Sequence, residues 1–303
     1  MVFADATPLW LAWNLSPTLI IGLGLLIGGY LYAVGPLARR ERWPERASRR
    51  QIVAFLSGAA VLVLALLSPL DALGDTYLFS AHMVQHLLIA IVAPPLLLLG
   101  VPAPLWERIV RGPYARGALR GLAHPAVAFG LFNADLWLWH VPALYDATLA
   151  NESIHIVEHL TFIVFGLIFW LPILGPRNIV ARIGKGTSVL YLFLACQPMV
   201  ALGALLTFAA QPFYAPYVHA PRLWGTTALG DQQLGGLIMW LPSNAPYLIA
   251  LSVLFFQWVG DHDQAERAAS GEYDDEPYEL FPSDPSAVPL PANAESTAIS
   301  PEV

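Results

Sequence analysis

Seven long apolar segments, joined by short polar connections, most constrain how this chain can fold. A bilayer core about 30 Å thick is crossed by about twenty apolar residues in helical form, because lipid offers the backbone no hydrogen-bond partner. The sequence therefore predicts an all-α integral membrane protein, a bundle of seven transmembrane helices in which consecutive helices pack antiparallel. The seven segments are residues 17–36, 50–70, 79–100, 124–140, 153–174, 187–209 and 234–258.

Composition excludes several other classes of protein. Of the 303 residues, 56% are hydrophobic and only 12% are charged, about half the charged fraction of a soluble domain. Fifteen basic residues against twenty-two acidic ones leave no excess positive charge for nucleic acid. A single cysteine, Cys196, excludes an internal disulfide, a four-cysteine cluster and a CxxC motif.

The basic residues predict the orientation of the bundle. Thirteen of them fall in or beside three alternate connections, whereas the opposite connections hold one, Arg222. Because cytoplasmic loops carry an excess of Lys and Arg, we expect an external N-terminus and a cytoplasmic C-terminus, in a multi-pass protein of the plasma (inner) membrane. The thirteen are Arg39, Arg40, Arg42, Arg46, Arg49, Arg50, Arg108, Arg111, Arg116, Arg120, Arg177, Arg182 and Lys185.

Three regions follow from this pattern. Residues 1–16 form a short external N-terminus, and because they contain no Lys or Arg we expect the first apolar segment to be retained rather than cleaved as a signal peptide. Residues 17–258 form the seven-span membrane domain. Residues 259–303 contain eleven of the acidic residues, which predicts a disordered acidic tail on the cytoplasmic side.

Histidines gather at the predicted outer ends of the helices. His82 and His86 lie four residues apart in the third segment, and His155 and His159 repeat that spacing in the fifth. Residues i and i+4 share one helix face, close enough for two imidazoles to reach one ion. We therefore predict a metal site formed by these four residues, with His140 as a fifth ligand or as a ligand at the entrance of the site.

Other polar and sulfur-containing residues are expected near this site. Ionisable side chains at membrane depth normally face the protein interior and have a partner. Glu158, Asp135 and Asp231 are therefore predicted to orient imidazoles through their second ring nitrogen. The thioethers of Met83 and Met239 are predicted to assist in binding or transferring the metal.

The residue types leave the metal open. Imidazole binds copper, zinc and iron, and nearby thioethers at an oxidising outer face favour copper. The run from His155 to His159 also matches a zinc-peptidase pattern, which would give a membrane-embedded zinc hydrolase with Glu158 or Asp135 as general base. Paired histidines on facing helices are also typical of a b-type haem protein. A binding role is favoured over catalysis, and no residue is assigned as catalytic.

Motifs across residues 75–258 resemble those of CtaG, a family of multi-span assembly factors of caa-three-type cytochrome c oxidase. The resemblance implies a plasma-membrane protein that interacts with oxidase subunits and is needed to make an active haem-copper oxidase, with copper handling as its expected chemistry. The matching motifs are HMVQHLL at 82–88, PPLLLLG at 94–100, WLWHVP at 137–142, LYD at 144–146, HIVEH at 155–159, FW at 169–170, DQQLGG at 231–236 and MW at 239–240.

Overall fold

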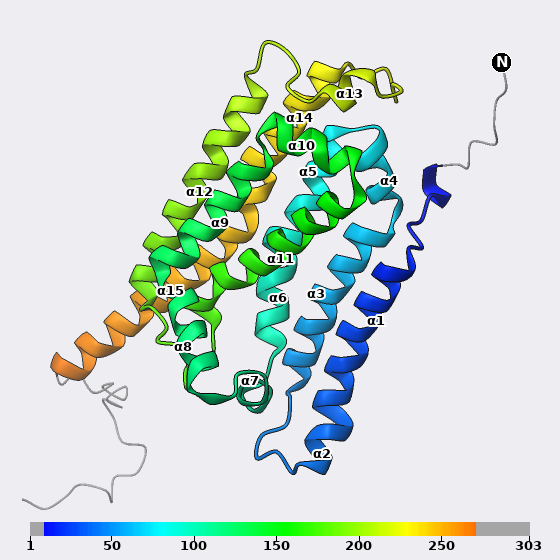
Figure 1. The fold of residues 1–303 in the computed structure, drawn as a ribbon. Coiled ribbons are helices and arrows are strands. Elements are labelled where there is room, and N and C mark those ends of the chain that lie inside the picture. Colours follow the sequence, from blue (N-terminus) through cyan, green and yellow to red (C-terminus); the bar gives the residue numbers. More distant parts are fainter. Residues whose placement is uncertain (1–8, 271–303) are drawn as a thin grey trace, which may run out of the picture. The chain divides into compact units, whose positions relative to one another are not determined.

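The computed structural model describes residues 9–270, and in that range every regular element is a helix (Figure 1). This confirms the predicted all-α class. The longer helices are α1 Pro17–Tyr32, α3 Arg49–Leu67, α4 Pro69–Thr76, α5 Phe79–Leu87, α6 Ala93–Gly100, α8 Gly112–Leu122, α9 Pro125–Trp139, α10 Pro142–Ala150, α11 Glu152–Leu174, α12 Lys185–Thr207, α14 Ala228–Trp240 and α15 Ala245–Ser270. Shorter ones are α2 Ala38–Arg40, α7 Ala103–Ile109 and α13 Ala215–His219.

Six helical stretches among the described residues are long and apolar enough to cross a membrane, so the chain has the character of a multi-pass membrane protein. They are Pro17–Arg40, Arg49–Leu67, Phe79–Gly100, Glu152–Leu174, Lys185–Thr207 and Ala228–Arg267. The predicted segment 124–140 is not among the six, because α9 has only 15 residues. At 1.5 Å per residue it extends about 22 Å, less than the bilayer core.

The chain divides into two compact units, with the boundary after Trp258. In the second unit the structure describes Val259–Ser270, which are helical. The predicted disordered tail, residues 259–303, is thus helical over its described part, and its remainder from residue 271, like residues 1–8 of the predicted N-terminal region, lies outside the described residues.

Proline interrupts the third apolar segment. The segment begins as α5, passes through a wider π-helical turn at Leu88–Val92, and continues as α6. Pro94 and Pro95 follow this turn, and a proline lacks the N–H for a regular helical hydrogen bond, which explains why the helix widens just before them. The turn begins two residues after His86, so both predicted ligands of this segment lie on α5.

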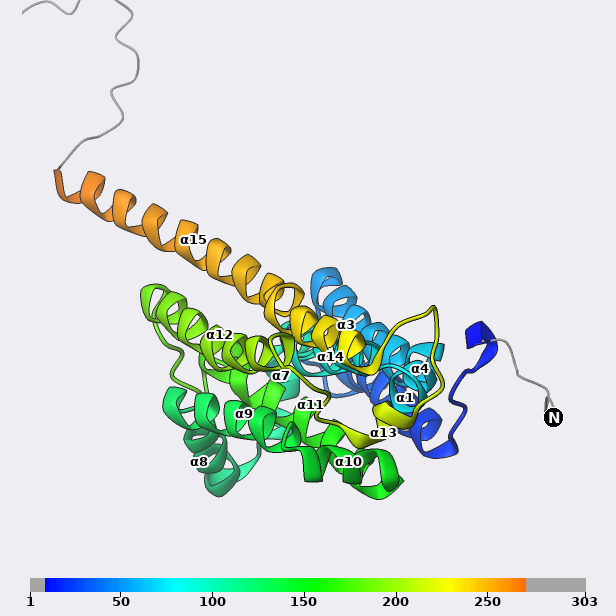
Figure 2. The same ribbon diagram turned by 90° about the horizontal axis from the view of Figure 1, so that it is seen from above.

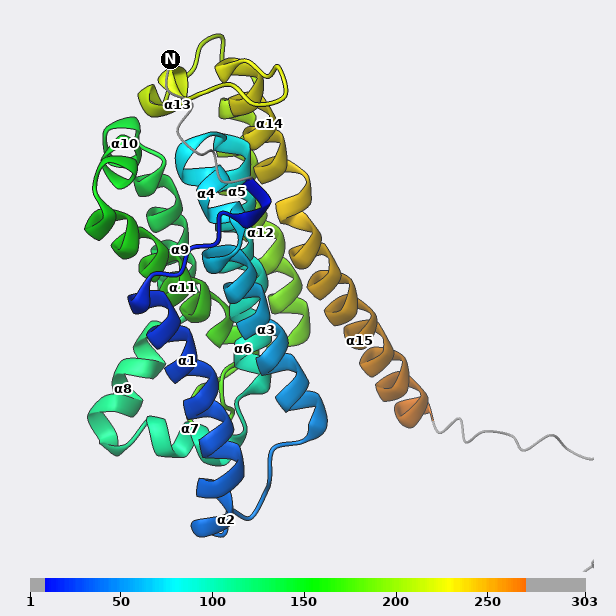
Figure 3. The same cartoon turned by 90° about the vertical axis from the view of Figure 1, so that its right-hand side faces the viewer.

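Glycines allow the central helices to approach closely. A Cβ atom on Gly166 of α11 would lie 2.6 Å from the carbonyl oxygen of Ala90, and one on Gly236 of α14 would lie 2.7 Å from that of Gly203 on α12. Small residues at such crossings are typical of membrane helix packing. They bring α11 against the third segment and α14 against α12. The turned views show α12 and α14 side by side (Figures 2 and 3).

The two ends of the unit that ends at Trp258 differ in chemistry. Helices α4, α10 and α13 lie at one end, together with the first turns of α5 and α11 (Figures 1 and 3). We call this the histidine end. Helices α2, α7 and α8 lie at the opposite end and carry many of the arginines. We call this the arginine end.

Candidate metal centre

Asp231 fixes the start of α5, the helix that carries His82 and His86. Its carboxylate accepts hydrogen bonds from the backbone N–H of Phe79 at 2.7 Å and of Ser80 at 3.3 Å, and from the Ser80 hydroxyl. A carboxylate at this position satisfies the free N–H groups of a helix N-terminus and interacts favourably with the helix dipole. Asp231 was predicted to orient an imidazole, and the structure instead places it on the α5 backbone.

Four residues from two helices converge at the histidine end. His82 comes from α5, and His155, Glu158 and His159 come from the first two turns of α11. One ligand atom from each lies within 4.8 Å of the ligand atoms of the other three. These four residues could hold a metal ion, and we call them the His/Glu group.

His86 lies beside this group without belonging to it. Its ring centre is 4.2 Å from that of His82 and 5.6 Å from that of His159. Its Nε2 atom is 3.7 Å from Oε1 of Glu158, too far for a hydrogen bond. The predicted four-histidine set is therefore present in one place, with Glu158 as the fourth member of the tighter group in place of His86.

Buried polar atoms without hydrogen bonds accumulate here. Both ring nitrogens of His82 and of His86 have no hydrogen-bond partner, and neither has either carboxylate oxygen of Glu158. The same holds for Nε2 of His155 and of His159. Such atoms are rare inside proteins because each costs about 1 to 3 kcal/mol. Because one imidazole offers a single nitrogen to a given ion, one nitrogen from each ring together with the Glu158 carboxylate fits the donor set of a bound cation.

Asp75 links the two helices of the group, and no sequence pattern indicated that it belongs to the site. Its two carboxylate oxygens lie 3.5 Å from Nδ1 of His82 and 3.5 Å from Nδ1 of His155. Burial raises the pKa of Asp75 to about 6, while the charge of His155 lowers it. A carboxylate on the second nitrogen of a ligating imidazole fixes the ring and increases its basicity.

Gly74 makes this contact sterically feasible. A Cβ atom at residue 74 would lie 3.0 Å from the Cα atom of His82, so α4 packs directly on the backbone of α5. Asp71, one turn earlier on α4, accepts hydrogen bonds from Gln85 of α5 at 2.8 Å and from Asn14 at 2.7 Å. These contacts hold α4, and with it Asp75, against α5.

His140 and Met83 lie on the other side of His86. The Nδ1 atom of His140 is 2.7 Å from the carbonyl oxygen of Leu136, and its Nε2 atom is 3.5 Å from the sulfur of Met83. The ring centres of His140 and His86 are 6.3 Å apart. Met239 is buried and lines a small cavity together with these three residues. Asp135, predicted to orient an imidazole, instead accepts a hydrogen bond from the Trp139 indole at 2.9 Å.

Comparison with known proteins gives the family. The family model described as "Cytochrome c oxidase caa3 assembly factor (Caa3_CtaG)" matches residues 28–261. The chain belongs to the Caa3_CtaG family. Uncharacterized proteins of Mycobacterium bovis and Mycobacterium tuberculosis are each 30% identical to it over 290 residues, and one of Mycobacterium leprae is 28% identical. These matches cover 85 to 86% of this chain but only 42% of each relative. No solved structure matches the chain.

In this Caa3_CtaG chain, tyrosines close the site at the histidine end. The ring of Tyr145 on α10 lies 5.4 Å from that of His82, and its hydroxyl is 3.1 Å from the hydroxyl of Tyr217 on α13. Tyr217 donates to the carbonyl oxygen of Gly74 at 2.7 Å, and Tyr214 donates to that of His140 at 3.1 Å. Burial raises the pKa of Tyr145 and Tyr217, which keeps the phenols neutral. Of these tyrosines, only Tyr145 lies in a motif singled out from the sequence, LYD at 144–146.

A lateral groove reaches the His/Glu group of this Caa3_CtaG chain. It has a volume of about 610 Å³, with Asp75, His155 and His159 among its polar lining residues and leucines of α1 and α3 among its apolar ones. His155 and His159 are therefore the members of the group that line this opening. His82 and Glu158 are fully buried behind them.

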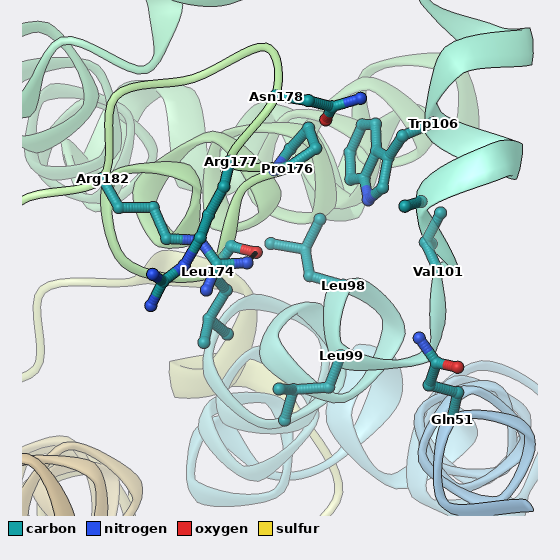
Figure 4. A pocket seen from close by; sticks show the side chains of 11 residues that line it. Gln51, Leu98, Leu99, Val101, Trp106, Leu174, Pro176, Arg177, Asn178 and Arg182 are labelled. Atoms are coloured by element: carbon teal, nitrogen blue, oxygen red, sulfur yellow. Dashed lines mark hydrogen bonds between the residues drawn. The ribbon is translucent and has the colours of Figure 1, made fainter. Parts of the chain in front are cut away.

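The arginine end carries a different kind of pocket. A cavity of about 450 Å³ is lined by Trp106, Arg177 and Arg182, among others, and Figure 4 shows the two arginine side chains close together. Arg182 donates to the carbonyl oxygens of Gly175 and Leu174. The described residues that line this cavity include no histidine and no carboxylate, so it lacks the donors of the metal centre.

Proposed function

We propose that this chain is an assembly factor for haem-copper cytochrome c oxidase that binds copper as its cargo through His82, His86, His155 and His159, with Glu158 as an additional ligand and His140 assisting. The family description supports the assembly role. The single observation that supports metal binding is the convergence of His82, His155, Glu158 and His159 within 4.8 Å. Oxidase subunits are the proposed partners.

Copper is the proposed metal because of the donor set. Imidazole nitrogens suit copper, zinc and iron, whereas thioethers select copper. Two methionine sulfurs predicted from the sequence, those of Met83 and Met239, lie in the cavity next to His86. Zinc has no comparable preference for a site supplemented by thioethers.

We also propose a seven-span topology with the histidine end outside. In this arrangement α9 is the additional span, and the predominantly basic connections lie at the cytoplasmic surface, as the positive-inside rule requires. The His/Glu group then faces the side on which a secreted or membrane-anchored oxidase domain would receive its metal. The lateral groove of about 610 Å³ gives the group an opening between α1, α3 and α11.

Metal analysis of purified protein tests the proposal. We expect copper to co-purify with the wild type and its content to fall in the His82→Ala and His155→Ala variants. The matched control is His124→Ala, because His124 is exposed at the start of α9 and its side chain forms no capping hydrogen bond. Metal-free wild-type protein that still supports full oxidase assembly would overturn the copper role.

A second measurement addresses the assembly role. Oxidase purified from a strain that lacks the gene is expected to contain less copper while its subunits are still synthesised. Complementation with the wild type should restore the copper content, and complementation with His155→Ala should not. Normal copper in the oxidase of the deletion strain would contradict the proposal.

The position of Glu158 also supports a second candidate, a membrane-embedded zinc hydrolase with Glu158 as general base. Glu158→Gln distinguishes the two. A hydrolase would keep its zinc and lose turnover, whereas a copper-binding factor would show weaker copper binding. Glu45→Gln, at an exposed position, is the control. The absorption spectrum of the same samples tests the haem alternative, which requires a Soret band.

A further inference from the structure

The methionines of this chain are concentrated in one place. The sequence contains four, and apart from Met1 they are Met83, Met199 and Met239. These three come from α5, α12 and α14, and all three line one cavity of about 20 Å³, together with His86 and His140. Methionine is often only a flexible packing residue. All three methionines of the described residues line this one cavity and come from three separate helices, which instead indicates a role for their sulfur atoms.

The cavity is suited to one soft, singly charged ion. Its volume is close to that of one water molecule, for which about 10 to 15 Å³ is needed. Met83, Met199 and Met239 are all buried, and the described residues that line the cavity include no carboxylate. Neutral thioether and imidazole donors, without a negative charge, favour monovalent copper over divalent metals.

The hydrogen bonding of His140 directs a free electron pair into this cavity. Its Nδ1 atom faces the carbonyl oxygen of Leu136 at 2.7 Å, and because a carbonyl only accepts, Nδ1 must carry the proton. In the neutral ring, Nε2 is then unprotonated. It faces the sulfur of Met83 at 3.5 Å, and a thioether has no hydrogen to donate. Two electron-pair donors therefore face each other.

That spacing matches a shared metal ion. Bonds of about 2.0 Å to nitrogen and about 2.3 Å to sulfur, at a tetrahedral angle, place the two donor atoms about 3.5 Å apart. The observed distance between Nε2 of His140 and the sulfur of Met83 is 3.5 Å. An ion between them would turn an unfavourable contact into a favourable one.

We infer that Met83, Met199 and Met239, with His86 and His140, form a second binding site that takes copper as Cu(I). We call it the thioether site. It rests on the proposed function in that copper is the cargo. His86 connects it to the His/Glu group, because His86 lines the cavity and its ring centre is also 5.6 Å from that of His159. Copper that enters as Cu(I) can occupy either site without a change of oxidation state.

Titration of the purified full-length protein with Cu(I) under anaerobic, reducing conditions tests the thioether site. A colorimetric Cu(I) chelator serves as the competitor, and Ag(I) serves as a second soft probe. We expect two equivalents of Cu(I) per wild-type chain. The triple variant Met83→Leu, Met199→Leu, Met239→Leu should lose one equivalent, and His155→Ala should lose the other. A triple variant that binds as much Cu(I) as the wild type overturns the proposal.

Spectroscopy on labelled protein identifies the ligand directly. In selenomethionine protein loaded with Cu(I), X-ray absorption at the selenium edge should show a copper neighbour, since three of the four methionines line the cavity. Cys196→Ala should leave this signal unchanged. A copper environment of nitrogen and oxygen alone would contradict the thioether site.

The design separates failure of the two proposals. If the His/Glu group binds no copper, His155→Ala will bind as much Cu(I) as the wild type, while the triple Met variant can still bind less Ag(I) than the wild type. If only the thioether site is wrong, the triple Met variant will bind as much Cu(I) and Ag(I) as the wild type, while His155→Ala binds less Cu(I). Each Met→Leu substitution conserves volume and usually costs less than about 1.5 kcal/mol. The triple variant is therefore checked for unchanged elution and for a cooperative thermal unfolding transition above the assay temperature.

Discussion

Asp75 shows how one side chain can organise a ligand cluster that it does not enter. It lies 3.5 Å from a ring nitrogen of His82 on α5 and 3.5 Å from one of His155 on α11. The sequence predicted the histidine pairs because their i, i+4 spacing is a local property. It assigned the orienting role to Glu158, Asp135 and Asp231 because their depth along the segments was right. Which acid faces an imidazole depends on how α4 packs on α5, and no local pattern contains that information.

The Asp75→Asn variant is expected to keep both histidines in place but to bind copper more weakly. Loss of an orienting carboxylate typically lowers metal affinity by about 10-fold to 100-fold. Competitive titration with a copper chelator measures the change in affinity at constant stoichiometry. Asp146→Asn, on α10 at the same end, serves as the control. Equal affinities for Asp75→Asn and the wild type would show that Asp75 does not orient the ligands.

At the scale of helices, close packing of α4 on α5 positions the site. Gly74 is a point of close approach between them, and Asp71 holds α4 through Gln85 and Asn14. The sequence predicted the third apolar segment, and the structure contains a helical stretch there, Phe79–Gly100, that is long and apolar enough to cross a membrane. The sequence did not predict α4 as a separate helix. This helix has only eight residues, Pro69–Thr76, which are too few to show a clear helical periodicity of apolar residues.

A methyl group at residue 74 is expected to push α4 away from α5. In the Gly74→Ala variant the added Cβ meets the His82 backbone at 3.0 Å, an overpacking that costs about 1 to 3 kcal/mol. We expect a lower thermal midpoint together with weaker copper binding. The control is Gly117→Ala on α8, where nothing lies within 4 Å of the new Cβ and alanine should be neutral or slightly stabilising. Similar midpoints for Gly74→Ala and the wild type would contradict the close contact.

The carboxyl group of Asp71 should give the protein a measurable pH dependence. Burial, and secondarily the charge of Asp75, raise its pKa to about 6 in the folded protein. The unfolded chain therefore loses this proton first as pH rises from about 4 to 6, and the free energy of unfolding falls by up to about 3 kcal/mol over that range. The Asp71→Asn variant lacks this pH-dependent part of the free energy of unfolding. Between pH 4 and 7 the thermal midpoint of the wild type should therefore fall relative to that of Asp71→Asn, and parallel curves for the two proteins would contradict the prediction.

At the scale of the whole chain, the helical class and the six stretches long and apolar enough to cross a membrane follow from apolar segment length, which sequence alone reveals. The fourth predicted segment, 124–140, is apolar, but the helix found there is limited by the Pro125 start and by the turn at His140 that leads into α10. Segment 234–258 is likewise divided by a short turn at Pro242–Asn244. Helix ends depend on such local stops, and hydropathy averages over them.

The proposed topology predicts which surfaces are exposed to each compartment. In a Cys196→Ala background, a cysteine at Ser153 should react with a membrane-impermeant thiol reagent in intact cells, because it lies at the start of α11 at the histidine end. A cysteine at Ala118 of α8 should react only after the cells are opened. Both positions are exposed in the structure. The opposite labelling pattern would show that the bundle has the inverted orientation, with the histidine end on the cytoplasmic side.

The shortness of α9 has a consequence for the surrounding lipid. Helices α11 and α12 beside it have 23 residues each, about 35 Å, against about 22 Å for α9. In the seven-span arrangement, this side of the bundle presents a hydrophobic mismatch, which a bilayer relieves by local thinning at a cost of fractions of a kcal/mol per Å. Lipids with shorter acyl chains should therefore gather around α9.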